Sequence, residues 1–226
     1  MCGRYNLTLS PVELQEFFDL FRDLEFEREW KPRYNISPTQ TVAAIRFDEE
    51  TGPRTPVLMR WGLIPRWAKD MKAKPQPINA RAEGVATSKM FSPLLKSKRC
   101  LIPATGFYEW QKTTRKAKQP FHIHGPQNEP FAFAGLWDTS KHDDEHVDSC
   151  TIITTTANET MEPIHDRMPM IVAPELFDRW LDPLSRGEIV LSSLLTEDAA
   201  LELETTAVST VVNNVRNESP DCLLPL

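Results

Sequence analysis

The 226-residue chain has little that would place it in a membrane or outside the cell. It lacks an apolar run of about 18 residues, the length that a membrane-spanning helix requires. Its first residues, MCGRYN, are polar and are soon followed by Pro11, which is unlike a secretory signal peptide. We therefore expect a soluble, cytoplasmic protein that does not associate with membranes.

Cysteines are few and widely spaced. The four lie at positions 2, 100, 150 and 222, with no CxxC pair and no cluster of cysteine and histidine. This pattern favours neither a disulfide framework nor a metal site, and we expect no cofactor. Cys100 and Cys150 lie in apolar runs typical of strands, so both are expected to be core residues.

Glycine is also scarce, with eight residues against 19 prolines, and the chain shows no internal repeat and no long linker. We therefore expect one domain, residues 1–226. Short apolar runs broken by Pro and Gly predict strands at 41–47, 56–62, 99–104, 107–110, 120–124, 131–137, 150–156, 169–173 and 204–209. Helices are predicted at 11–24, where Ser10 and Glu13 form a capping box, and at 79–90, 174–181 and 189–202. The predicted fold class is α+β, with a mostly antiparallel sheet closing toward a barrel.

The net charge of −6 disfavours nucleic-acid binding, but its distribution does not. Between Arg54 and Lys118 there are 15 Lys and Arg against three acids, a local balance of +12, so the remainder carries −18. Such asymmetry is typical of a polyanion-binding face on an acidic body. The alternative is that these charges scatter over a solvated surface.

Cys2 follows a methionine that is usually removed before a small residue. Removal would leave an α-amine and a thiol on adjacent carbons, with ordinary pKa values of about 8 and 8.5. Such an amine condenses with an aldehyde to a Schiff base, and the thiol can then close a five-membered thiazolidine ring. The alternative is that Cys2 is only the second residue of a frayed terminus.

Four further residues carry polar groups suited to chemistry. Glu109 interrupts the apolar run GFYEW, where a carboxyl is expected to be partly desolvated and to serve in proton transfer. His165 lies between Ile164 and Asp166 in PIHDRMP and is a candidate general acid or base. Asn79 and Arg81 lie at the expected start of a helix inside the basic segment, where they suit phosphate or carbonyl oxygens. A purely structural role remains open for each of them.

Aromatic residues among the basic ones are typical of single-strand binding. Trp61 and Trp67 flank GLIPR, and we expect Trp61 to be core and Trp67 to be exposed. Arg4 follows Cys2 by two residues, so its guanidinium could lower the pKa of the thiol or hold a phosphate beside it.

Seven short motifs, in order along residues 2 to 217, resemble the SRAP (SOS-response-associated peptidase) family. They are MCGRYN, RYNISPTQ, MRWGLIPRWAKD, INARAE, RCLIPATGFYEW, IHDRMP and VVNNVRN. The resemblance implies a protein that caps abasic sites in single-stranded DNA through a thiazolidine crosslink to the N-terminal cysteine. It also implies a strand-rich core with peripheral helices, a positively charged groove, a monomer, and association with the nucleoid when bound to DNA.

Carried over to this sequence, the resemblance makes Cys2 the nucleophile and gives Asn79 the role of orienting the sugar or amine. Glu109 would move protons during ring opening and Schiff-base formation, and His165 would act as acid or base at the sugar hydroxyl and in crosslink reversal. The implied DNA-contacting or supporting positions are Arg4, Asn35, Trp67, Arg81, Thr154 and Arg167.

Two other functions stay open at this point. One is an N-terminal-nucleophile cysteine peptidase or amidohydrolase, because class II glutamine amidotransferases also begin Met-Cys-Gly; their Asn-Gly oxyanion element has no counterpart here. The family's name also suggests autoproteolysis, for which the one obvious event is loss of Met1. The other is a non-covalent single-strand-binding module, which leaves Cys2, Glu109 and His165 without a role.

Overall fold

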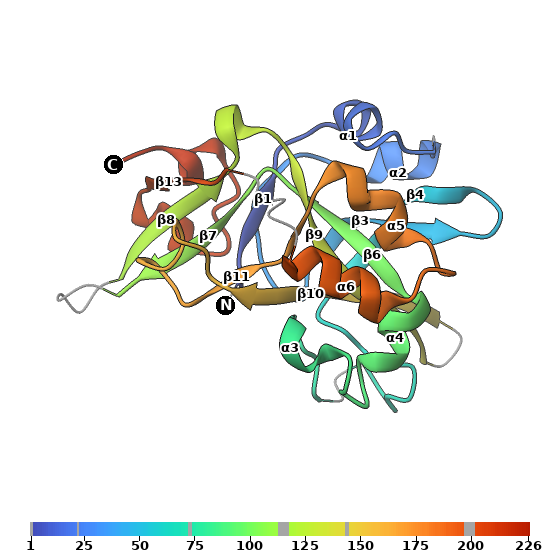
Figure 1. Cartoon of the computed structure of the whole chain (residues 1–226). Coiled ribbons are helices and arrows are strands. Elements are labelled where there is room, and N and C mark those ends of the chain that lie inside the picture. Colours follow the sequence, from blue (N-terminus) through green and yellow to red (C-terminus); the bar gives the residue numbers. More distant parts are fainter. Residues whose placement is uncertain (1, 22, 72–73, 113–117, 143–144, 197–201) are drawn as a thin grey trace.

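The computed structural model describes residues 2–21, 23–71, 74–112, 118–142, 145–196 and 202–226. Within these residues, five strands close into a barrel because β10 pairs with strands at both ends of the series (Figure 1). Around the ring they are β4 (Gly52–Trp61), β3 (Thr41–Asp48), β6 (Arg99–Ala104), β9 (Phe131–His142) and β10 (Glu145–Thr156). Neighbours are antiparallel except β4 and β10. The predicted α+β class with a barrel-like sheet is confirmed.

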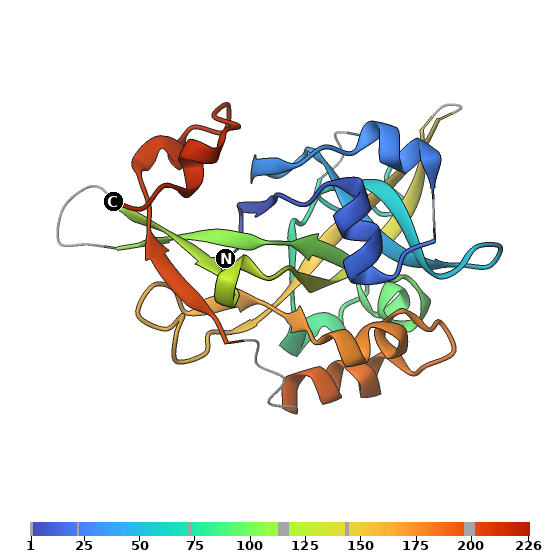
Figure 2. The same cartoon turned by 90° about the horizontal axis from the view of Figure 1, so that it is seen from above.

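A second sheet lies beside the barrel and has five strands in the described part of the chain. Their order is β13 (Glu204–Ala207), β8 (Gln119–His124), β7 (Gly106–Gln111), β1 (Tyr5–Leu7) and β2 (Arg33–Ile36). Two 3-10 turns near the C-terminus, η3 (Thr210–Asn213) and η4 (Pro220–Leu223), cover one face of this sheet, at the end of the molecule away from α5 and α6 (Figures 1 and 2).

Aromatic packing joins the two sheets. Tyr5 of β1 is fully buried, and its ring meets Trp61 and Phe133 edge to face at centroid distances of 5.4 and 5.7 Å. Such pairs contribute about 0.5–1.5 kcal/mol each beyond the burial of their area. The contacts fix β1 against the barrel, so the position of the residues just before Tyr5 is also fixed. Trp61 is buried, as predicted.

Helices lie around the barrel, as predicted from the resemblance. They are α1 (Pro11–Phe18), α2 (Leu24–Glu29), α3 (Ala82–Val85), α4 (Ser92–Ser97), α5 (Phe177–Leu181) and α6 (Gly187–Thr196). In the described residues, no helix is long and apolar enough to cross a membrane.

The first helix is shorter than predicted. The capping box is present, with the Glu13 amide donating to Ser10 Oγ at 3.3 Å and the Ser10 amide donating to Glu13 Oε2 at 2.8 Å. The helix nevertheless ends at Phe18, because Asp19 adopts a left-handed conformation (φ 50°) and closes the C-terminus. The prediction of one helix over 11–24 is therefore wrong at its C-terminal end.

The helix predicted over 79–90 is also wrong. Its first residues form a short strand, β5 (Asn79–Arg81), which pairs in parallel with Ile152–Thr154 of β10. The only helix within this range in the described structure is the four-residue α3. Asn79 and Arg81 are consequently strand residues, and Arg81 is also the N-cap residue of the short α3. The helix predicted over 189–202 begins at Gly187, and residues 197–201 lie outside the described residues.

Candidate active site

The N-terminal segment runs along β7 and ends against β5. Tyr5 and Asn6 pair with Phe107 and Gly106, and the Tyr108 amide donates to the Arg4 carbonyl at 2.9 Å. Continuing this antiparallel register by one more residue places Gly3 opposite Glu109. Cys2 is therefore brought to the part of β7 that carries the candidate carboxylate, and it is fully buried there.

Asn79 holds Cys2 from the side of the barrel. Its Nδ2 donates to the Cys2 carbonyl at 2.8 Å, which links β5 directly to the N-terminal segment. Asn79 Oδ1 is buried and accepts no hydrogen bond from the described residues. An unused acceptor in a buried place is costly unless a donor arrives, so this oxygen suits an amine or a sugar hydroxyl.

Glu109 and Cys2 are electrostatically coupled. Glu109 is 4% exposed, as expected of a desolvated carboxyl in β7. Burial raises the pKa of the Cys2 thiol far above its usual range, and the Glu109 carboxylate raises that pKa further. The thiol is accordingly protonated at neutral pH, whereas a cysteine with the ordinary pKa of about 8.5 is partly ionised. A neutral thiol needs a base to accept its proton, and the neighbouring Glu109 carboxylate is a candidate for that base.

The Arg4 guanidinium contacts other partners than the thiol, and it is the Arg4 backbone hydrogen bond that lowers the pKa of the Cys2 thiol, against the larger effect of burial. Arg4 Nη1 donates to Asn35 Oδ1 at 2.7 Å and to the Val212 carbonyl at 2.8 Å, while the guanidinium lies 5.6 Å from the Trp110 ring centroid. Asn35 is fully buried and donates to the carbonyls of residues 212, 214 and 217. The two side chains therefore fix the C-terminal segment beside the N-terminal one.

His165 lies in the turn between β10 and β11 (Arg167–Pro169), and its side chain is 29% exposed. Its Nδ1 accepts from the Arg167 amide at 3.0 Å and lies 2.9 Å from Asp166 Oδ1. This ring nitrogen therefore lies between a backbone N–H donor and a carboxylate oxygen. Gln111 Nε2 donates to the Pro163 carbonyl at 2.8 Å and so ties this turn to the end of β7.

Arg167, Thr154 and Arg81 meet where β5, β10 and β11 run together. Arg167 forms a bidentate ion pair with Glu83 and donates to the Thr154 carbonyl at 2.7 Å. Thr154 is fully buried, whereas Arg81, its partner across the β5–β10 pairing, is exposed. This geometry gives Arg167 and Thr154 supporting contacts and leaves the guanidinium of Arg81 facing solvent.

Trp67 lies in the connection between β4 and β5 and is 62% exposed, as predicted. An exposed indole within the basic segment is suited to stacking on a base. Several basic residues of that segment have structural partners instead: Lys98 pairs with the buried Asp138 at 2.7 Å, and Arg99 is buried against backbone carbonyls.

Sequence reasoning missed two supporting residues, Glu83 and Gln111. Both lie within motifs that were singled out, Glu83 in INARAE and Gln111 directly after GFYEW. Their roles depend on partners 84 and 52 residues away, which no local pattern shows.

Comparisons with known proteins identify the family and the fold of the chain. The profile of the SRAP family, described as SOS response associated peptidase, matches residues 1–215. The chain is 42% identical over 225 residues to the abasic site processing protein YoaM of Bacillus subtilis, covering 99% of this chain and 97% of that one. It is 31% identical over 232 residues to the abasic site processing protein YedK of Escherichia coli, covering both chains completely. A crystal structure from Bacteroides thetaiotaomicron shares the fold over both full chains, with a TM-score of 0.86 at 22% identity.

Proposed function

The chain belongs to the SRAP family, and from that premise we propose that it processes abasic sites in single-stranded DNA by forming a covalent crosslink to Cys2. The relatives named as abasic site processing proteins support this substrate. The observation that carries the proposal is the convergence of three groups from distant parts of the chain. Cys2, Asn79 and Glu109 meet at one buried place, joined by the Asn79–Cys2 hydrogen bond and by the coupling of thiol and carboxylate.

The reaction needs only the aminothiol and the open sugar. After Met1 is removed, the Cys2 amine adds to the aldehyde carbon of the ring-opened abasic site, and the resulting carbinolamine loses water to give a Schiff base. The Cys2 sulfur then adds to that same carbon while its proton passes to Glu109, and the nitrogen gains a proton. The product is a thiazolidine, and one water has been released overall.

The buried thiol supports this order of steps. A cysteine peptidase needs a thiolate that attacks first, and such thiolates occur where the pKa of the cysteine is lowered. Here burial raises that pKa, which favours attack by the amine and leaves the thiol to close the ring with Glu109 as base. This supports crosslinking over the peptidase alternative.

His165 and Asn79 have complementary roles in the proposal. Asn79 orients the N-terminal residue through the Cys2 carbonyl and offers Oδ1 to the attacking amine or the sugar. His165 exchanges a proton with the sugar hydroxyl, and in the reverse direction it assists opening of the crosslink. We propose that the single-stranded DNA runs past Trp67 and Arg81, because both side chains are exposed. Trp67 would stack on a base and Arg81 would bind a phosphate.

The experiment is to incubate the protein with matched oligonucleotides, one carrying an abasic site and one intact, and to separate the products under denaturing conditions. A heat-stable shifted species with the abasic strand alone is expected. A non-covalent single-strand binder would give no such species with either strand, and a peptidase would cleave added peptides without forming it. A variant with Met1 retained is the matched control, because its amine is held in a peptide bond.

A further inference from the structure

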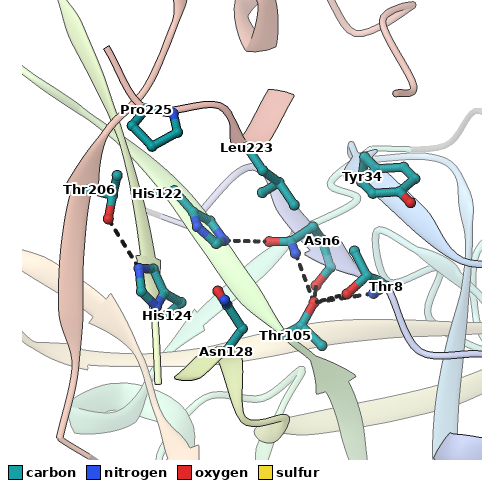
Figure 3. A pocket seen from close by; sticks show the side chains of 10 residues that line it. All are labelled: Asn6, Thr8, Tyr34, Thr105, His122, His124, Asn128, Thr206, Leu223 and Pro225. Atoms are coloured by element: carbon teal, nitrogen blue, oxygen red, sulfur yellow. Dashed lines mark hydrogen bonds between the residues drawn. The ribbon is translucent and has the colours of Figure 1, made fainter. Parts of the chain in front are cut away.

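Figure 3 shows the residues that line a cavity of about 430 Å³. The strand register places this cavity on the face of the sheet opposite to Glu109. Side chains alternate between the faces of a strand, so Glu109 and its partner Phe121 point one way, whereas Tyr108 and its partner His122 point the other. The cavity is lined by His122 and by residues of β1, β2, β13 and the C-terminal segment. It is therefore separate from the Cys2 site.

Its polar groups form an ordered network. Asn6 Nδ2 donates to Thr105 Oγ1 at 2.8 Å, so the Asn6 Oδ1 that lies 2.9 Å from His122 Nε2 must be the acceptor. His122 Nε2 thus carries a proton, and Nδ1 is left as an acceptor to which no described residue donates. Gly106 makes room for this arrangement, since a Cβ there would come within 2.1 Å of His122 Nε2.

His124 also lines the cavity. Its ring stacks on His122 with centroids 4.9 Å apart, and both histidines are more than nine-tenths buried. His124 Nδ1 lies 2.9 Å from the Gly125 carbonyl, so this atom donates, and Nε2 lies within hydrogen-bond distance of Thr206 Oγ1 at 3.2 Å. Glu204 lies nearby, 3.9 Å from His124 Nδ1, with its side chain 60% exposed.

The lining defines the class of ligand. Among the described residues, no Lys, Arg, Asp or Glu lines the cavity, so these walls hold no counter-charge for a phosphate or a carboxylate. Burial and the neighbouring His124 lower the pKa of His122 to about 3, which keeps that ring neutral at physiological pH. What remains is a set of amides, hydroxyls and aromatic rings, including Asn128 and Tyr34. Donors, acceptors and ring faces together match the edge and face of a nucleobase.

We propose that this cavity binds a nucleobase, either as a free nucleoside or as an unpaired base of a strand. Its volume lies within the range of about 300–1,000 Å³ that is typical of small-ligand sites. Because no cation lines it, base binding here is insensitive to salt, in contrast to strand binding, which depends on phosphate contacts. The site acts independently of Cys2 and of the proposed crosslinking.

The test is to titrate the full-length Cys2→Ala protein with each of the four deoxynucleosides and follow the imidazole resonances of His122 and His124 by NMR. Saturable shifts with at least one deoxynucleoside, equal at low and high salt, are expected. A short oligonucleotide of that base distinguishes the two sources, because it shifts the same resonances only if a base within a strand can enter.

Two adjacent threonines give a matched pair of variants. Thr206→Val removes the hydroxyl at the wall and should weaken binding roughly 3- to 10-fold, the effect of one hydrogen bond. Thr205→Val, on the opposite face of β13, should leave binding unchanged. The proposal is overturned if no deoxynucleoside shifts either histidine, if free sugars shift them equally well, or if both threonine variants behave alike. None of these outcomes depends on adduct formation, so failure here and failure of the crosslinking proposal are distinguishable.

Discussion

His122 should make the protein less stable in mild acid. Its pKa falls from the ordinary 6.5 to about 3, chiefly because of burial and secondly because of His124. Between these two values the unfolded chain binds a proton at this position and the folded protein does not. Stability is therefore fully present above about pH 6.5 and decreases as the pH falls toward 3.

The size of the effect follows from the two pKa values. At pH 5, about 1.5 units below the ordinary histidine pKa of 6.5, protonation of this side chain stabilises the unfolded state. One pH unit of this difference corresponds to about 1.36 kcal/mol. His122 thus accounts for about 2 kcal/mol of lost stability between pH 7 and pH 5. The side chain is only 4% exposed, so solvent screening reduces this figure little.

Urea unfolding at the two pH values, followed by tryptophan fluorescence, measures this loss. We compare the wild type with His122→Gln, whose amide can still donate to Asn6, and with His146→Gln at an exposed position of β10. Between pH 7 and pH 5, the free energy of unfolding of the wild type and of the His146 variant should fall by about 2 kcal/mol more than that of the His122 variant. An equal loss in all three proteins would refute the assignment of a buried, neutral His122.

Three further predictions concern the proposed reaction and the strand that carries the lesion. Glu109→Gln should slow adduct formation about 100-fold, the usual scale for losing one general base, while fluorescence anisotropy shows an unchanged affinity for the strand. His165→Ala should slow release more than formation, which a chase of preformed adduct with excess unlabelled abasic strand measures; an unchanged release rate would contradict the role given to it. Arg81→Ala should weaken the binding of intact and abasic strands equally and reduce the salt slope by about 1, whereas Lys141→Ala, at the far end of the β9–β10 hairpin, should do neither.

Local patterns predicted the strands well, because apolar runs that are bounded by Pro and Gly are too short to form helices. The run RCLIPA became β6 with the same bounds, and GFYEW fell within β7. The first helix was overestimated because the apolar spacing of Leu14, Phe17 and Phe18 continues to Phe21 and does not show where a cap ends the helix. The left-handed Asp19 ends it, and Phe21 lies 51% exposed beyond it.

Contacts between residues far apart in the chain could not be predicted from local sequence patterns. The basic segment suggested a broad cationic face, yet Lys98 and Arg99 are occupied by Asp138 and by carbonyls from distant elements. The pKa of the Cys2 thiol depends on burial by strands far along the chain, so its direction could not be read from MCGRYN. The candidate catalytic residues themselves were found from local motifs, and the fold then brought Cys2, Asn79 and Glu109 together.

The central claim is that one carbon of the abasic sugar bonds to both the nitrogen and the sulfur of Cys2. The most direct measurement is to form the adduct, alkylate every accessible thiol under denaturing conditions, digest with nuclease and trypsin, and identify the modified peptide by mass spectrometry. The account predicts that the peptide Cys2–Arg4 carries the sugar remnant with the loss of one water and has neither a free amine nor an alkylated thiol. A remnant on a lysine, or on a Cys2 peptide whose thiol is alkylated, would contradict it.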